Sequence, residues 1–166
     1  MLKDTDIAWL AGFWDGEGSV GLVRNKKTLI LQAQLSHTEY GSVIRILRLL
    51  KAAGITRRGY TYQERDPKKH RDAHYIRVTS ISNVGMLADL LLPHAVTKKR
   101  YWQIASKWAK RRTKIAGGTD RFGRLKRGGK NRFGYSEKEL ALAKELSSLN
   151  LRGPEDRARR AEGRIK

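Results

Sequence analysis

Alternation of apolar and polar residues predicts two β-hairpins. From Thr28 to His37, Leu29, Leu31, Ala33 and Leu35 share one side of an extended chain, and the polar residues share the other. This strand follows one from Ser19 to Asn25 after a short link, which favours a hairpin. The segments Ile55–Arg65 and Ala73–Ser82 predict a second hairpin with a basic loop.

Apolar residues spaced three and four apart predict helices between and after these hairpins. The expected helices run from Asp4–Asp6 to Gly16, Glu39–Ala53, Val84–Leu92 with Asn83 as its cap, Thr97–Arg112, and onward from Ser136, where Glu139 completes a capping box.

The resulting order is αββαββα, so we expect an α+β fold with one curved, four-stranded antiparallel sheet. Residues 1–112 hold this core. Residues 113–135 are rich in glycine, lysine and arginine and predict a flexible basic linker, and residues 136–166 predict a C-terminal helix and a basic tail.

The formal net charge of +20 predicts a polyanionic partner: DNA, RNA or an anionic membrane. No apolar run approaches the ~20 residues needed to span a bilayer and the N-terminus has no signal-like apolar segment, so we expect no membrane partner. The chain has no cysteine, and its four histidines lack zinc-ligand spacing. These features fit an intracellular protein of a bacterial or archaeal cytoplasm or of an organelle.

The stretch WLAGFWDGEGS has unusually little side-chain bulk on one side of its predicted helix. Ala8, Ala11, Gly12 and Asp15 share that side. A glycine inside a helix costs about 1 kcal/mol relative to alanine, so this side needs a compensating contact. We expect a second backbone to approach it closely.

Residues Leu10–Ser19, LAGFWDGEGS, resemble without gaps the signature of the LAGLIDADG homing endonucleases. The resemblance covers roughly Asp4 to Arg112 and implies the same order of helices and strands. It also implies that paired motif helices form an interface and that carboxylates at their ends lie beside the two cut phosphates.

Glu17 is the first candidate catalytic residue. Its carboxylate and the Gly16 carbonyl are hard oxygen ligands that suit Mg²⁺, or another divalent cation such as Mn²⁺, for phosphodiester hydrolysis. The chain has one copy of the motif, so we expect a homodimer in which Ala8, Ala11, Gly12 and Asp15 form the interface. Many family members carry Asp where this chain has Glu17, which leaves the metal geometry open. Asp15 fits helix termination better than metal binding.

Lys98 and His37 are further candidates, both from the resemblance. Lys98 lies five residues after Pro93, like the family lysine near the cut phosphate, and the alternative is a solvated lysine. His37 ends a strand where the family often has a water-ordering glutamine. Thr38 is an alternative for that position, and an ordinary surface histidine is another.

The outer face of the sheet is the expected reader of the DNA major groove. The candidate DNA-binding residues are Thr28, Ile30, Gln32, Gln34, Arg58, Tyr60, Tyr62, Arg77, Thr79, Lys99 and Arg100. A β-bulge would exchange the faces, so each assignment depends on register. The basic stretch Lys107–Arg132 is expected to contact phosphates, with a solvated tail as the alternative.

The leading hypothesis is a homodimeric, metal-dependent endonuclease that cuts a long pseudo-palindromic site in double-stranded DNA. The resemblance implies intron homing, and no intein splice-junction residues flank the motif. Two alternatives are an RNA-binding maturase that assists splicing of its intron RNA, and a non-catalytic DNA-binding protein.

Overall fold

The computed structural model describes residues 2–25, 28–56, 58–64, 72–117 and 134–150. Helices and strands follow the order αββαββα, and two further helices, α4 and α5, come after it. Their bounds are α1 Asp4–Glu17, β1 Gly18–Asn25, β2 Thr28–His37, α2 Tyr40–Ala52, β3 Arg58–Gln63, β4 Ala73–Val78, α3 Ile81–Leu91, α4 Lys99–Ile115 and α5 Glu137–Leu149.

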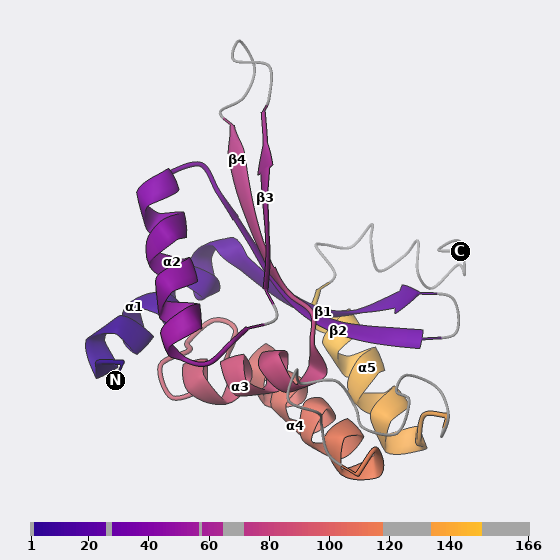
Figure 1. Ribbon diagram of the computed structural model, residues 1–166. Helices are drawn as coiled ribbons and strands as arrows, with labels where there is room; N and C mark the ends of the chain where they lie inside the picture. The colour runs from indigo at the N-terminus through magenta and orange to yellow at the C-terminus, as the bar shows by residue number, and fades with distance from the viewer. Residues whose placement is uncertain (1, 26–27, 57, 65–71, 118–133, 151–166) are drawn as a thin grey trace.

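The four strands form one antiparallel sheet in the order β1-β2-β4-β3. The predicted α+β class and the four-stranded sheet are therefore confirmed. Helices gather on one side of the sheet, and the β3–β4 and β1–β2 hairpins extend in different directions from its centre (Figure 1). The other side of the sheet, which we call the outer face, carries the exposed side chains of Gln34 and Arg77.

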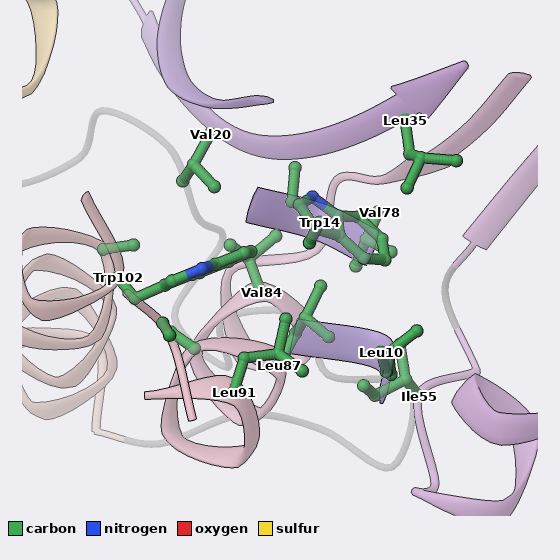
Figure 2. Packing of buried hydrophobic residues seen from close by; sticks show 14 of the residues in the cluster. Leu10, Trp14, Val20, Leu35, Ile55, Val78, Val84, Leu87, Leu91 and Trp102 are labelled. Atoms are coloured by element: carbon green, nitrogen blue, oxygen red, sulfur yellow. The ribbon is translucent and has the colours of Figure 1, made fainter. Parts of the chain in front are cut away.

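The core lies between the sheet and the helices. Trp14 of α1, Trp102 of α4 and Leu35 of β2 are at most 1% exposed. Figure 2 shows Trp14 and Trp102 within this cluster, and their rings meet edge-on with centroids 6.1 Å apart. Fully burying side chains of this size contributes about 1.5–3 kcal/mol each or more, so the motif helix is a central part of the core.

Several predicted boundaries were wrong in specific ways. Gly16 does not end α1, which continues to Glu17 and is capped by Gly18. Asn83 does not cap α3: the helix begins at Ile81 after Ser80, and the buried Asn83 side chain donates to the Ser80 hydroxyl at 3.3 Å. The early start of α3 also ends β4 at Val78.

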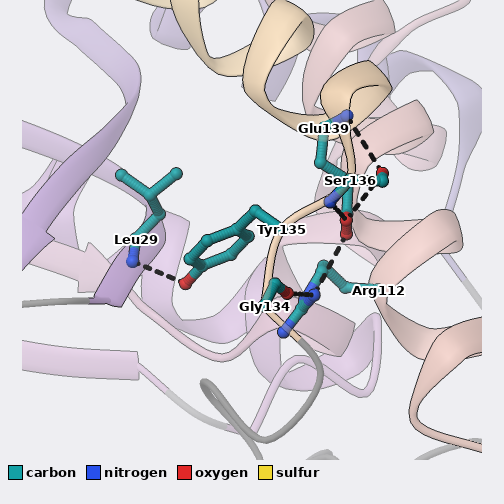
Figure 3. A network of polar contacts seen from close by, with 6 residues as sticks. All are labelled: Leu29, Arg112, Gly134, Tyr135, Ser136 and Glu139. Atoms are coloured by element: carbon teal, nitrogen blue, oxygen red, sulfur yellow. Dashed lines mark hydrogen bonds and ion pairs between the residues drawn. The ribbon is translucent and has the colours of Figure 1, made fainter.

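The C-terminal helix packs onto the core. Ser136 and Glu139 form the predicted capping box, and Leu146 is fully buried. Buried Arg112 of α4 pairs with Glu139 at 3.3 Å and donates to the Gly134 carbonyl at 2.7 Å (Figure 3). The Tyr135 hydroxyl accepts from the Leu29 N–H of β2 at 2.7 Å.

These contacts revise the predicted domain boundaries where the structure describes them. Residues 113–115 belong to α4 instead of a linker, and residues 134–150 share the core of residues 1–112. The rest of the predicted linker, 118–133, and the predicted tail, 151–166, lie outside the described residues.

Candidate nuclease site and nucleic-acid interface

The end of α1 is fixed to the segment before α4 through Asp15. Its carboxylate accepts the backbone N–H groups of Val96 at 2.6 Å and of Thr97 and Lys98 at 3.0 Å. The Asp15 carbonyl also accepts from the Lys98 ammonium. Asp15 therefore holds Lys98 at the end of the motif helix, an arrangement that its place in the sequence did not indicate.

Glu17 is the last residue of α1, and its side chain is exposed. The peptide carbonyls of the last helical turn have no partner within the helix, so the Gly16 carbonyl lies among the natural acceptors of this end. The structure thus brings Glu17, Gly16 and Lys98 to one end of α1. Within the described ranges no group of three or more His, Asp or Glu residues is arranged to hold a metal ion.

The glycines of the motif differ in what surrounds them. A Cβ on Gly18 would lie 2.0 Å from Cδ1 of Trp14, so the chain's own core requires a glycine there. A Cβ on Gly12 or Gly16 would meet nothing within 4 Å. The helix-weakening glycines at positions 12 and 16 are therefore not explained by packing within the chain.

The exposed face of α1 differs from the predicted interface. Ala8 and Gly12 are exposed, but Ala11 is 0% exposed and packs into the chain's own core. Asp15 is occupied by the contacts to residues 96–98. The exposed stripe, spaced three, four and four residues apart, consists of Thr5, Ala8, Gly12 and Gly16.

His37 lies half-buried at the end of β2, where its ring meets Phe13 of α1 edge-on with centroids 4.9 Å apart. This contact places His37 beside the motif helix. Thr38 is exposed. The next residue, Glu39, caps α2: hydrogen bonds from Ser42, and then from the Gly41 N–H, lower the pKa of its carboxyl.

The predicted residues of β2 share the outer face of the sheet. Gln34 lies opposite Arg77 of β4, and both are exposed. Thr28, Ile30 and Gln32 alternate on the same face, and Thr79 is exposed just beyond β4. These positions stay candidates for DNA contact.

The predicted residues of β3 lie on the opposite face. Arg58 pairs with Val78, Tyr60 with Ile76 and Tyr62 with His74, so these residues share the side of the sheet that the helices cover. Directly opposite residues of an antiparallel pair project to the same face. The prediction that Arg58, Tyr60 and Tyr62 share the outer face with Arg77 was therefore wrong. The residues of β3 on that face are shifted by one position in the sequence.

Tyr60 and Tyr62 surround a buried histidine. The Tyr60 hydroxyl and His74 Nδ1 are 2.8 Å apart, and the Tyr62 hydroxyl donates to Asp72 at 2.6 Å. This hydrogen bond to Asp72 raises the pKa of Tyr62 to about 12. Arg58 donates to the Ile55 carbonyl at 2.8 Å.

The register shows which β3 residues the sequence analysis missed. Gly59, Thr61 and Gln63 lie opposite Arg77, Tyr75 and Ala73 and so belong to the outer face. In RGYTYQ the second, fourth and sixth residues are small or polar, which indicates an exposed face. The sequence prediction chose the larger tyrosines instead.

Lys99 and Arg100 lie in the first turn of α4. Lys99 is exposed. The Arg100 guanidinium pairs with Glu145 of α5, with Nε 2.7 Å from the carboxylate, and thereby joins the two helices. Arg100 already has an acidic partner within the chain, so its assignment to DNA binding is weaker than that of Lys99.

Comparison with known proteins agrees with this fold and motif. Residues 4–90 match the family described as LAGLIDADG-like domain. This match covers more than half of the chain, and the chain belongs to the LAGLIDADG family. No curated protein sequence matches it. None of the described helices is long and apolar enough to cross a membrane.

Solved structures that resemble the chain include three DNA complexes. Two are homing endonuclease I-CvuI with DNA targets, at 20% and 21% identity and TM-score 0.48, each covering 86% of this chain and 95% of the other. The third is the LAGLIDADG meganuclease I-AabMI bound to uncleaved DNA, at 20% identity and TM-score 0.50, covering 83% of this chain and 49% of that one. The chain thus spans about half of I-AabMI.

Proposed function

We propose that this chain is a homodimeric, divalent-metal-dependent endonuclease that cuts a specific site in double-stranded DNA. The observation that carries the proposal is the end of α1, where exposed Glu17 follows two residues after Asp15, which holds Lys98. Membership of the LAGLIDADG family and the similar fold of the meganuclease I-AabMI, which was solved bound to DNA, support DNA as the substrate.

The oxygen donors at this end of α1 fit Mg²⁺ or Mn²⁺, which prefer carboxylate and carbonyl ligands. Glu17 and the Gly16 carbonyl would hold the ion. A bound ion would activate water and neutralise charge on the phosphate. Lys98 would place a positive charge beside the same phosphate, since its backbone is fixed by Asp15.

Two protomers complete the proposed site. The exposed stripe of Thr5, Ala8, Gly12 and Gly16 lets a second α1 approach closely, because small residues keep two backbones near each other. A twofold axis along this stripe would bring two Glu17 residues together, one for each DNA strand. I-AabMI is about twice as long as the part of it that this chain covers, which fits a second copy here.

DNA sequence would be read by the outer face of the sheet. Gln32, Gln34 and Arg77 provide amide and guanidinium groups for base edges, and Thr61 and Gln63 extend this set across β3. Intron homing is the biological role that the family implies for such an enzyme.

The test uses a plasmid pool with randomised target sites, incubated with and without Mg²⁺. We expect metal-dependent double-strand breaks from the wild-type protein, and Glu17→Gln to lower the cleavage rate by about 10³-fold or more. The reason is that a bound metal contributes several kcal/mol to the transition state, and each ~1.4 kcal/mol is a factor of ten.

Glu137→Gln is the matched control, because this exposed carboxylate lies on α5 in the first turn. It should cut like the wild type. Sedimentation of the free protein and of the DNA complex tests the dimer. No metal-dependent cutting anywhere in the pool would refute the nuclease proposal, and a monomer on DNA would refute the shared site.

A further inference from the structure

A basic groove runs between α4 and α5, separate from the end of α1. Its volume is about 530 Å³. Lys107, Lys110 and Arg111 line it from α4, and Lys138 lines it from α5. Its apolar lining residues are Ala141 and Leu142.

The positive charge of this groove is only partly neutralised by the chain. Its one acidic lining residue, Glu145, is already paired with Arg100. Lys110 pairs with Asp89 at 2.9 Å. Lys107 and Lys138 have no ion pair with any residue that the structure describes, and both are exposed.

The α4 lysines of the groove lie on other sides of that helix than the side that faces the sheet. Trp108 of α4 faces the sheet, because its ring packs against Tyr135, with centroids 6.3 Å apart, and Tyr135 bonds to Leu29 of β2. Lys107 and Lys110 project from other sides of the same helix and are exposed. Figure 1 shows α4 and α5 beneath the β1–β2 hairpin, on the side opposite the outer face.

We infer that this groove binds the phosphate backbone of a second DNA segment while the outer face of the sheet holds the target. The inference rests on the proposed function for the identity of the polyanion. Lysines that are not paired within the protein release counterions when they contact phosphates, which gives affinity without sequence specificity. A protein with one DNA-binding surface on the sheet and a second in this groove can contact two duplexes at once.

The chain has no cysteine, so a single introduced cysteine can carry a photocrosslinker. Ala141→Cys places it in the groove of the full-length protein, and Lys51→Cys on α2 is the reference position. An end-labelled duplex of arbitrary sequence is the probe, added to free protein and to protein saturated with an unlabelled specific target.

We expect crosslinking from position 141 to exceed that from position 51 severalfold and to persist when the sheet is occupied. Lys107→Gln with Lys138→Gln should suppress it and lower the slope of log affinity against log salt by about 1.8, for two lost phosphate contacts. Arg48→Gln with Lys51→Gln, which removes the same charge from exposed positions of α2, should leave the position-141 crosslink unchanged.

Equal crosslinking from positions 141 and 51, or equal losses in the two charge variants, would overturn the inference. Stronger competition by RNA than by duplex DNA would overturn the choice of DNA. Because the free-protein arm needs neither a target site nor cleavage, its outcome is independent of the nuclease proposal. Cutting by a protein that gives no groove crosslink would refute the groove alone.

Discussion

Helix α1 and strand β3 each have one side that contacts the chain itself and one side that is open. On α1, Leu10, Ala11 and Trp14 are at most 1% exposed, whereas a Cβ on Gly12 would meet nothing. On β3 the difference is subtler, since Tyr60 and Tyr62 are about half exposed although they contact His74.

This difference between α1 and β3 shows where the size of the side chains in a sequence indicates which side of an element is buried. In the middle of a core, bulk marks the inner side, because close packing fills the space with large apolar groups. β3 is an edge strand that extends past most of the core, and its aromatic rings form a local cover over one histidine. There the small and polar residues, Thr61 and Gln63, mark the outer face.

The largest predicted effect is on the inner side of α1. Trp14→Ala should destabilise the fold by about 3–5 kcal/mol, the usual range for removing a buried tryptophan. Trp14 is fully buried and meets Trp102. Urea unfolding followed by circular dichroism measures the change.

Trp9→Ala is the control, since Trp9 lies half-buried on α1 with Arg45 over its ring at 4.1 Å. It should cost clearly less than Trp14→Ala. Equal losses would contradict the division of α1 into a packed and an open side.

Two glycine variants test that division more finely. Gly18→Ala should destabilise the protomer by about 1–3 kcal/mol, because its Cβ would overlap Trp14 and force the core to shift. Gly12→Ala should stabilise the isolated protomer by up to about 1 kcal/mol through helix propensity. Unfolding at low protein concentration measures both.

The same Gly12→Ala variant should weaken the proposed dimer, because the added methyl group separates two close backbones. Sedimentation over a range of concentrations detects this loss. A dimer that tolerates Gly12→Ala and also Gly12→Leu would show that α1 does not form the interface.

Local sequence signals predicted much of the fold and part of the site. The α5 capping box and the alternation in β2 depend on neighbours in sequence and were confirmed. The arrangement at the end of α1 depends on Asp15 accepting hydrogen bonds from Val96, Thr97 and Lys98. These partners lie 81 to 83 positions later in the chain, so no local pattern reveals the contact. The face of β3 depends on its register with β4, and one step of register exchanges the faces.

A smaller effect is expected from the outer face of β3. Gln63→Ala should reduce discrimination between the target and single-base variants at one position by about 1 kcal/mol, the lower end of the range for a base contact. Tyr62→Phe keeps the ring on the opposite face and should leave discrimination unchanged. Binding titrations against a panel of single-base variants measure both, and the reverse result would contradict the observed register.

The smallest effect concerns the helix-covered side of β3 at high pH. Protonated Tyr62 donates to Asp72, which raises the pKa of Tyr62 from 10.0 to about 12. A pKa that is higher in the folded state means a stabilising contribution that is complete below pH 10 and lost as pH rises towards 12. Ultraviolet titration should therefore show one tyrosine that ionises at higher pH than the others, and this step should disappear in Tyr62→Phe.

Asp72→Asn should move the pKa of Tyr62 back towards 10.0, because a neutral amide does not hold the hydroxyl proton as a carboxylate does. A late step that persists in Asp72→Asn would assign it to another tyrosine and remove this evidence that Tyr62 bonds to its own chain.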